Sequence, residues 1–277
     1  MPSTSILITG CSSGIGEHAA SALKQRGYRV FASARKQSDV EKLKINGFES
    51  LQLDVTDANS IQQALQTILS LNDGKLDALF NNAGFLQTGA IEDLTPAMNL
   101  TQFETNVFGP MELVRQVLPI MRKQGHGRII QNSSILGVVT LPYCGAYNAS
   151  KFALEGFSNT LRQELRHTNI HVSIINPGPI TSKLRDHAYE HHQQNKEIMT
   201  QSAHQKAYES LEKSYFGEEK KDRLSQSPQA VVDQLIHALE SRRPCAHYYI
   251  GLPAKMLALA RRLLPDTALD WLLSKVR

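Results

Sequence analysis

The sequence has few cysteines and no strong excess of either charge. Of its 277 residues only Cys11, Cys144 and Cys245 are cysteines. Because they are odd in number and far apart, they argue against a disulfide framework and a metal site, and they are typical of a reducing compartment. The 30 basic and 26 acidic side chains give a net charge of +4 and form no dense basic stripe with interleaved aromatics. We therefore expect a cytoplasmic protein with no nucleic-acid partner.

Long apolar runs are also missing. No uninterrupted apolar stretch reaches 18 residues, and the first residues, Met-Pro-Ser-Thr-Ser, lack a charged region followed by an apolar one. We expect neither an export signal nor a membrane span. Hydrophobic residues make up 41% of the chain, which is enough for one large core. The length suits a single α/β domain over residues 1–277.

Short apolar runs alternate with helical patterns along the chain. The runs predict strands at residues 5–9, 28–33, 51–55, 76–80, 127–134, 171–175 and 246–250. Helical periodicity between them predicts helices from the glycine loop to 26, from about 57 to 71, over 96–123, from 147 onward and from 228 to about 242. This alternation predicts a doubly wound parallel sheet of the Rossmann type, with ligands bound beyond the carboxyl ends of the strands.

A glycine-rich turn follows the first predicted strand. It reads Gly10-Cys11-Ser12-Ser13-Gly14-Ile15-Gly16 and leads into a helix. Glycines let the backbone turn tightly and approach a pyrophosphate, whose charge the free N–H groups of the helix N-terminus stabilise. The turn therefore predicts a dinucleotide site, although its spacing differs from that of the commonest fingerprint.

The second predicted strand ends without an acidic residue. Ala34 stands where an Asp or Glu would accept a hydrogen bond from a ribose 2′-hydroxyl, and Arg35 follows it. A guanidinium binds a 2′-phosphate well, and we expect the hydroxyl of Ser12 in the glycine loop to help it. The pattern predicts NADP(H) rather than NAD(H).

Other strand ends carry polar or small residues. Asp54 follows the third strand and either accepts a hydrogen bond from an adenine amino group or only caps a helix. The turn Asn81-Asn82-Ala83-Gly84 follows the fourth strand and admits a flat ligand against the backbone. Asn106 is an amide within a predicted helix, where it either bonds a specific partner or weakens the helix. Pro177-Gly178 ends the sixth strand.

The strongest chemical signal is Tyr147-x-x-x-Lys151, with Ser134 upstream at the end of the fifth strand. If Tyr147 opens a helix, Lys151 lies one turn along on the same face. A nearby ammonium can stabilise a phenolate by roughly 2 to 3 pKa units, which makes the tyrosine an acid or base near neutral pH. The hydroxyl of Ser134 would orient a substrate carbonyl.

Together these motifs resemble the short-chain dehydrogenase/reductase family of the Tyr-Lys type. The resemblance covers roughly residues 5–185, with residues 5–181 as the dinucleotide-binding and catalytic core. It implies that Tyr147 is the acid/base, that Lys151 lowers its pKa and holds the nicotinamide ribose, and that Ser134 polarises the substrate carbonyl. It further implies that Asn106 keeps a water in a proton relay to Lys151.

The resemblance also assigns cofactor contacts. It places Asp54 at adenine with Val55 as a neighbouring contact, Asn82, Ala83 and Gly84 at the adenosine ribose side, and Ile180 and Thr181 at the carboxamide and pyrophosphate, after Pro177 and Gly178. Some NADP-dependent members carry a base at the position of Ser13. Since this chain has none there, Arg35 must supply most of the selectivity for a 2′-phosphate.

Residues 182–277 are expected to form a substrate lid, a last strand and C-terminal helices. Ala203, Ala207, Leu211 and Tyr215 have helical spacing and predict an amphipathic lid helix. His187, His191 and His192 have no carboxylate or cysteine array around them, so we expect a solvated face and no metal. Residues 252–276 predict an apolar and basic helical pair, for which core packing, a subunit contact and a membrane-surface position remain open.

These features predict an NADP(H)-dependent oxidoreductase that reduces an apolar aldehyde or ketone. The tail resembles the retinol and hydroxysteroid dehydrogenase side of the family, and also a group of bacterial NADP-dependent aldehyde reductases. Oxidation of a retinoid or steroid alcohol is therefore the first alternative, and non-catalytic sensing of NADP(H) is the second. The resemblance implies a homodimer or homotetramer.

Overall fold

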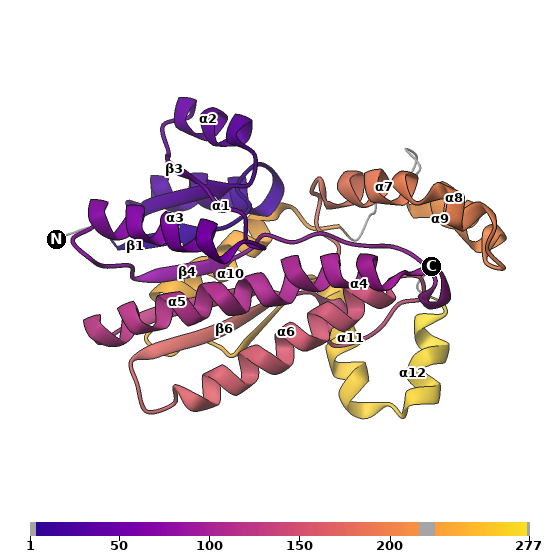
Figure 1. The fold of residues 1–277 in the computed structure, drawn as a ribbon. Coiled ribbons are helices and arrows are strands. Elements are labelled where there is room, and N and C mark those ends of the chain that lie inside the picture. The colour runs from indigo at the N-terminus through magenta and orange to yellow at the C-terminus, as the bar shows by residue number, and fades with distance from the viewer. Residues whose placement is uncertain (1–3, 216–224, 276–277) are drawn as a thin grey trace.

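The computed structural model describes residues 4–215 and 225–275. Its centre is a seven-stranded, all-parallel sheet with the strand order β3-β2-β1-β4-β5-β6-β7 (Figure 1). The strands are β1 (Ser5–Ile8), β2 (Arg29–Ala34), β3 (Glu49–Gln52), β4 (Ala78–Asn81), β5 (Gly127–Asn132), β6 (Ile170–Pro177) and β7 (His247–Ile250). The predicted doubly wound α/β fold is confirmed.

Helices cover both faces of the sheet because side chains alternate along each strand. Ile6 and Ile8 of β1 point into one core with α1 (Gly14–Gln25), α2 (Gln37–Ile45) and α10 (Pro228–Glu240). Leu7 points into the other core with α3 (Ala58–Leu71), α5 (Gly109–Gln124) and α6 (Gly145–Glu164). Helices therefore cover both faces of the sheet, so a ligand can reach the sheet only at the ends of its strands.

Two elements differ from the sequence expectation. Helix α2 was not anticipated, because it buries only Val40 and Leu43 and has a weak apolar pattern. Strand β3 begins and ends earlier than the expected 51–55. Asp54 leaves the ladder because its backbone N–H bonds the Ser60 hydroxyl and its carboxylate accepts from Thr56.

The long helix expected over 96–123 contains a π-helical turn. Helix α4 (Pro96–Phe103) leads into the turn η2 (Glu104–Phe108), and α5 follows directly. Asn106 lies in this turn and is buried. π-helical turns inside α-helices occur frequently at functional sites, and here the turn interrupts the regular backbone hydrogen bonds around Asn106.

The last third of the chain adds two helical units to the sheet. The lid consists of α7 (Leu184–Gln194), α8 (Lys196–Thr200) and α9 (Gln205–Tyr215), in place of the single helix expected. Helices α11 (Leu252–Leu263) and α12 (Asp266–Leu273) form a hairpin at the lower right of Figure 1. The expected continuation to Val276 lies outside the described residues. Among the described helices, none is long and apolar enough to span a membrane.

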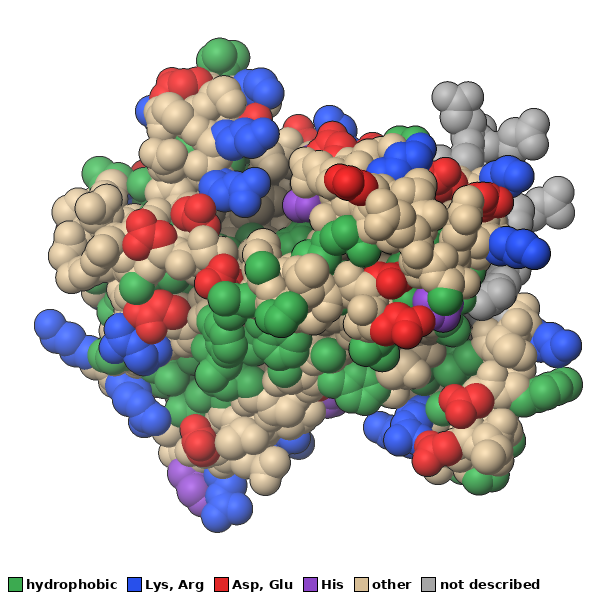
Figure 2. Space-filling view, turned by 45° about the vertical axis from the view of Figure 1, so that its right-hand side comes forward, with side chains coloured by type: hydrophobic (Ala, Val, Ile, Leu, Met, Phe, Trp, Pro, Cys, Tyr) green, Lys and Arg blue, Asp and Glu red, His purple; other side chains and the backbone are tan. Residues whose placement is uncertain are grey.

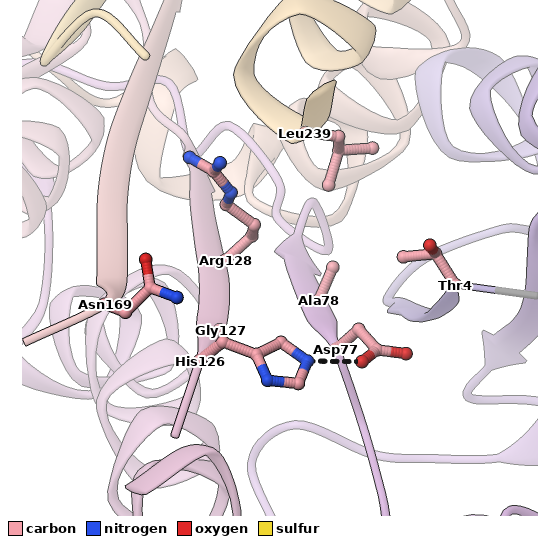
Figure 3. Close-up of a pocket in the computed structure, with 8 residues that line it drawn as sticks. All are labelled: Thr4, Asp77, Ala78, His126, Gly127, Arg128, Asn169 and Leu239. Carbon is pink, nitrogen blue, oxygen red and sulfur yellow. Dashed lines mark hydrogen bonds and ion pairs between the residues drawn. The ribbon is translucent and has the colours of Figure 1, made fainter. Parts of the chain in front are cut away.

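A hollow of about 260 Å³ lies at the amino ends of β1, β4, β5 and β6 (Figure 3). Asp77 accepts hydrogen bonds from the backbone N–H and hydroxyl of Ser5, and one carboxylate oxygen lies 2.8 Å from Nε2 of His126. Arg128 donates to the carbonyl oxygen of Ser241 at the end of α10. These groups join strands and cap a helix, and the hollow lies at the edge opposite the candidate catalytic residues.

Candidate active site

The glycine loop has the backbone that a phosphate site needs. Gly10 and Gly14 have φ of +72° and +62°, which favour glycine. A Cβ on Gly16 would lie 2.2 Å from the carbonyl oxygen of Gly10. Ser13 is the N-cap of α1 and makes no side-chain capping bond, so the first N–H groups of the helix are open to an anion. The loop therefore fits a dinucleotide pyrophosphate.

Arg35 is exposed at the carboxyl end of β2, and Ser12 is exposed in the glycine loop. Within residues 4–215 and 225–275, the guanidinium of Arg35 has no hydrogen bond or ion pair. A free cation at this position fits the expected 2′-phosphate. Oδ1 of Asp54 accepts from the backbone and hydroxyl of Thr56, while Asp57, not Asp54, caps α3. Val55 is buried beside it and packs under Gly109.

A chain of hydrogen bonds joins the glycine loop to the catalytic helix. Asn82 donates to the carbonyl oxygens of Thr9 and Gly10 at 2.9 and 3.2 Å. The amide of Asn132 donates to Oδ1 of Asn82 at 2.9 Å, and Nζ of Lys151 donates to the Asn132 carbonyl at 2.8 Å. The predicted cofactor loop and the predicted catalytic lysine are thus held in one rigid array.

Tyr147 and Lys151 lie on the same side of α6, as their spacing predicted. The helix begins at Gly145, and Nζ of Lys151 lies 5.6 Å from the centre of the Tyr147 ring. Both side chains are buried. Burial lowers the pKa of Lys151 to about 8, and the nearby Glu155 carboxylate acts in the opposite direction. The lysine charge therefore faces the phenol in a site largely shielded from water, where it acts strongly.

Ser134 lies two residues beyond β5 and is mostly buried. Its hydroxyl accepts from the backbone N–H of Leu136 at 3.1 Å, which fixes the side chain at the start of the short turn η3 (Ile135–Gly137). Since the hydroxyl oxygen acts as the acceptor in this bond, its hydrogen can still be donated to a substrate carbonyl.

Asn106 bonds a specific partner, which was one of the two expected possibilities. Its amide oxygen accepts from the N–H of Phe85, and its amide nitrogen donates to the Phe85 carbonyl and to Oγ of Ser150. It thereby ties the turn after β4 to α6. A Cβ on Gly84 would lie 3.1 Å from Oδ1 of Asn106 and 3.9 Å from Nζ of Lys151, so this turn passes close to the lysine.

The segment after β6 faces the glycine loop. Gly178 donates to the Ile250 carbonyl at 3.0 Å, and the N–H of Thr181 bonds the carbonyl of Gln226. Cβ of Ser182 lies 3.3 Å from where a Cβ on Gly14 would stand. Ile180 packs against the core. The chain after Pro177 therefore crosses in front of the glycine loop, at the side where we expected the pyrophosphate.

The lid covers Tyr147. Leu184 and Ala188 of α7 pack in an apolar cluster with Leu86 and Tyr147. Tyr208 of α9 donates to Asp93 at 2.6 Å and accepts from the N–H of Ala90, which fastens the lid to the loop after β4. Of the four residues expected to share one helix, Ala207 and Leu211 lie in α9, whereas Ala203 precedes it. The side chain of Tyr215 lies outside the described residues.

The expectation of a solvated histidine face was wrong for two of the three histidines. His192 is 1% exposed, with Nδ1 3.3 Å from the Thr88 hydroxyl and Nε2 3.4 Å from Glu212. His191 packs on Phe85 with 4.8 Å between ring centres. Only His187 is exposed. The lid folds back on the core and buries this side of α7, and no metal-binding group of three ligands occurs within the described part of the chain.

Sequence reasoning missed Asn132 and Glu155. Asn132 connects Asn82 to Lys151, and Glu155 is a buried carboxylate that accepts from the amide of Asn176 at 2.5 Å and lies 3.5 Å from Nδ1 of His247. An acidic residue one helical turn after Lys151 was the available signal for Glu155. Its partners come from β6 and β7, which only the folded sheet brings together.

Comparison with known proteins agrees with this geometry. A family model described as short chain dehydrogenase matches residues 4–193. The chain belongs to the short-chain dehydrogenase family. It is similar to the uncharacterized oxidoreductase YbbO of Escherichia coli K12, with 38% identity over 97% of this chain and 93% of that protein. It is also similar to a 3-ketodihydrosphingosine reductase of Bacteroides thetaiotaomicron, with 34% identity over 97% and 96% of the two chains.

Solved structures of this family share the fold. A single-residue variant of the actinorhodin polyketide ketoreductase, solved with NADPH, superposes with a TM-score of 0.71 at 26% identity and covers 89% of this chain and 95% of its own. The protein is therefore an oxidoreductase of the short-chain dehydrogenase family.

Proposed function

We propose that this short-chain dehydrogenase reduces an apolar aldehyde or ketone with NADPH. The observation that carries the proposal is the buried Tyr147–Lys151 pair, held beside the glycine loop by the Asn82–Asn132–Lys151 hydrogen bonds. An acid next to a dinucleotide loop is what reduction of a carbonyl requires.

The residues of this chain fit NADPH. Ser13 and the glycine loop would hold the pyrophosphate, Arg35 and Ser12 the 2′-phosphate, and Asp54 with Val55 the adenine. Asn82, Ala83 and Gly84 would lie along the adenosine ribose, with Pro177, Gly178, Ile180 and Thr181 on the other side. When bound, NADPH supplies the hydride.

Protein groups supply the proton and the orientation. The Lys151 ammonium stabilises the Tyr147 phenolate, so the tyrosine can give its proton to the carbonyl oxygen near neutral pH. Ser134 donates to the same oxygen and stabilises its developing negative charge. Asn106 would position the relay that returns a proton to Lys151. These roles need no metal ion.

The surroundings of Tyr147 favour an apolar substrate. Leu86, Leu136, Leu184 and Ala188 pack around the ring, together with the half-buried Cys144. A charged substrate group placed against these apolar side chains would lose its hydration, whereas an apolar one would gain from the contact. The relative named 3-ketodihydrosphingosine reductase supports a ketone with a long apolar chain as one candidate.

The direct test is NADPH consumption against medium-chain aldehydes, aromatic aldehydes, ketosteroids and retinal. We expect Tyr147→Phe to lower kcat by roughly 10²- to 10⁴-fold, which is the usual contribution of a general acid, while the Kd for NADPH stays within about twofold. Substantial turnover by Tyr147→Phe would refute the assignment. Turnover of retinoids or steroids alone would favour the oxidative alternative, and tight NADPH binding without any turnover would favour a sensor.

The choice between NADPH and NADH is tested at Arg35. Because a charge-assisted bond to phosphate is worth about 1.5–3 kcal/mol, Arg35→Ala should weaken NADPH binding by roughly 10- to 100-fold and leave NADH binding unchanged. Arg122→Ala, which removes an exposed cation at the far end of α5, is the matched control. An unchanged NADPH to NADH preference in Arg35→Ala would contradict the proposed selectivity.

We also propose that the protein forms a homodimer or homotetramer in a reducing, cytoplasmic environment. Exposed apolar side chains gather in the middle of the face in Figure 2. The exposed apolar residues of α4, η2, α5 and α6 include Leu100, Phe108, Met111 and Phe152. Apolar patches of this kind are typical of subunit interfaces. All three cysteines are free thiols, which suits a reducing compartment. Light scattering on the wild type and on Phe108→Asp tests the oligomeric state.

A further inference from the structure

Helix α11 carries an exposed apolar stripe. Leu252, Met256, Leu259 and Leu263 are 66%, 60%, 57% and 70% exposed. Their spacing of four, three and four residues places them within roughly 60° of arc on the helix surface. Single exposed apolar residues are ordinary, but a continuous stripe along a whole helix is unusual on a free surface.

The opposite side of α11 is fixed to the body of the protein. Ala254 and Ala258 are buried and pack with Ile135 and Val139, in the segment between Ser134 and Tyr147. Leu269 and Leu273 of α12 complete this cluster. The hairpin therefore contributes to the core through one face only, and the stripe points away from it. Core packing, one of the expectations for this segment, accounts for half of the helix.

Basic side chains accompany the stripe. Lys255 and Arg262 flank it on one side of α11, and no acidic residue occurs between Leu252 and Leu263. The hairpin over 252–275 holds Lys255, Arg261, Arg262 and Lys275 against Asp266 and Asp270, four minus two, or a net charge of +2. Asp266 is already paired with Arg261.

An aromatic anchor lies on the second helix. Trp271 is 66% exposed, and Nζ of Lys275 lies 5.8 Å from the centre of its ring. Tryptophan is enriched where apolar and aqueous phases meet, because its ring is apolar and its N–H is polar. An apolar stripe, a basic flank and an exposed tryptophan are the features of a helix that lies in the surface of a bilayer.

We propose that the α11–α12 hairpin docks on the surface of a lipid bilayer that contains anionic lipids. The stripe would enter the boundary between headgroups and acyl chains, while Lys255 contacts the headgroup phosphates. Arg262 hydrogen-bonds the Tyr249 side chain and adds positive charge on the same side of α11. Two copies of the hairpin facing each other would bring like charges together, so the charge favours an anionic lipid surface over a second copy. Docking one short hairpin is reversible and needs no spanning helix.

Docking would bring the bilayer next to the substrate site. The hairpin packs on the segment between Ser134 and Tyr147, so an apolar substrate dissolved in the membrane would be near the catalytic groups. This consequence rests on the proposed function, whereas the docking itself does not and is tested without turnover.

The test is co-sedimentation of the full-length protein with vesicles of phosphatidylcholine, with and without about one-third phosphatidylglycerol. We expect binding to the anionic vesicles and weaker binding at high salt, because screening shortens the range of the attraction. Loss of one buried leucine corresponds to at least about tenfold in affinity, so Leu259→Glu should lower the partition coefficient by more than tenfold. Ile45→Glu is the matched control, since Ile45 is 84% exposed on α2.

Circular dichroism and thermal unfolding of Leu259→Glu check that the variant is folded, without recourse to the proposed activity. Wild-type protein that stays in the supernatant with anionic vesicles would overturn the proposal. A halved molecular mass of Leu259→Glu in light scattering, together with absent vesicle binding by the wild type, would identify a second copy as the occupant and would also overturn it. Equal loss of binding in Ile45→Glu would show that the stripe has no special role.

Discussion

Gly16 tests the location of the cofactor site with a matched control in the same chain. Gly16 in α1 and Gly156 in α6 are both helical glycines without a positive φ. A Cβ on Gly156 would meet nothing within 4 Å. A Cβ on Gly16 would lie 2.2 Å from the Gly10 carbonyl oxygen and 2.6 Å from the amide nitrogen of Asn82. Gly16→Ala and Gly156→Ala therefore make the same chemical change in a helix and differ only in the atoms that surround the new methyl group.

The magnitudes follow from helix propensity and packing. Gly→Ala inside a helix stabilises by about 0.8–1 kcal/mol, so Gly156→Ala should raise Tm by roughly 1.5 °C. At Gly16 the same gain is opposed by overpacking of about 1–3 kcal/mol, since backbone atoms must separate by roughly 1 Å. The shift would displace the N–H groups that face the pyrophosphate. Losing one or two charge-assisted bonds of about 1.5–3 kcal/mol weakens NADPH binding by roughly 10- to 1,000-fold.

The assay is fluorescence titration of NADPH on both variants, with thermal unfolding in parallel. We expect Gly156→Ala to bind as the wild type does and Gly16→Ala to bind much more weakly while remaining folded. Wild-type affinity in Gly16→Ala would refute the placement of the pyrophosphate on this loop. Equal weakening in both variants would point to a general effect of alanine in helices.

Further predictions concern the buried charges and the lid. Lys151→Met should abolish turnover and raise the free energy of unfolding at pH 7 by at most about 3 kcal/mol. The pKa of Lys151 is about 8 in the folded protein and 10.5 in the unfolded chain, so the buried charge destabilises the wild type fully below pH 8 and no longer does so above pH 10.5. Urea unfolding of both proteins across this pH range measures the difference. Glu155→Gln removes the charge that raises the pKa of Lys151, so the alkaline limb of kcat/KM should move to lower pH, and an unmoved limb would exclude this coupling. Tyr208→Phe leaves the Ala90 N–H without its acceptor and removes one of the two hydroxyl donors to Asp93, the other being Ser202. This costs about 1–3 kcal/mol locally, and amide exchange in α9 should quicken by roughly 10- to 100-fold with α6 unchanged.

Local patterns were enough for the parts of the site that lie close in sequence. Tyr147 and Lys151 are one helical turn apart, so their shared face follows from helix geometry alone. The glycine loop between β1 and α1 has positive φ angles that glycine adopts freely. Strands that alternate with helices predicted the parallel sheet, because helical crossovers join parallel strands and cover both faces of the sheet.

Contacts between distant segments could not be predicted in this way. The weakly amphipathic α2 was missed because its helix depends on packing against β2 and β3 as well as on its own pattern. The histidines of α7 looked solvated because their burial depends on Phe85, Thr88 and the lid helix α9. The path from Asn82 through Asn132 to Lys151 crosses three elements, and no spacing in the sequence encodes it.

The sequence by itself thus determined the fold class, through the alternation of strands and helices, and it pointed to the glycine loop and to the Tyr147–Lys151 pair as candidate site residues, because each of these two motifs lies within one or two helical turns. Only the tertiary structure decided the surroundings of those groups. It buries Lys151 beside Glu155, closes α7 over Tyr147, and leaves one side of α11 uncovered while the other packs on the segment after Ser134. Burial and long-range contacts depend on how the whole chain packs. The pKa of a single lysine or the exposure of a single leucine therefore cannot be predicted from its neighbours in sequence.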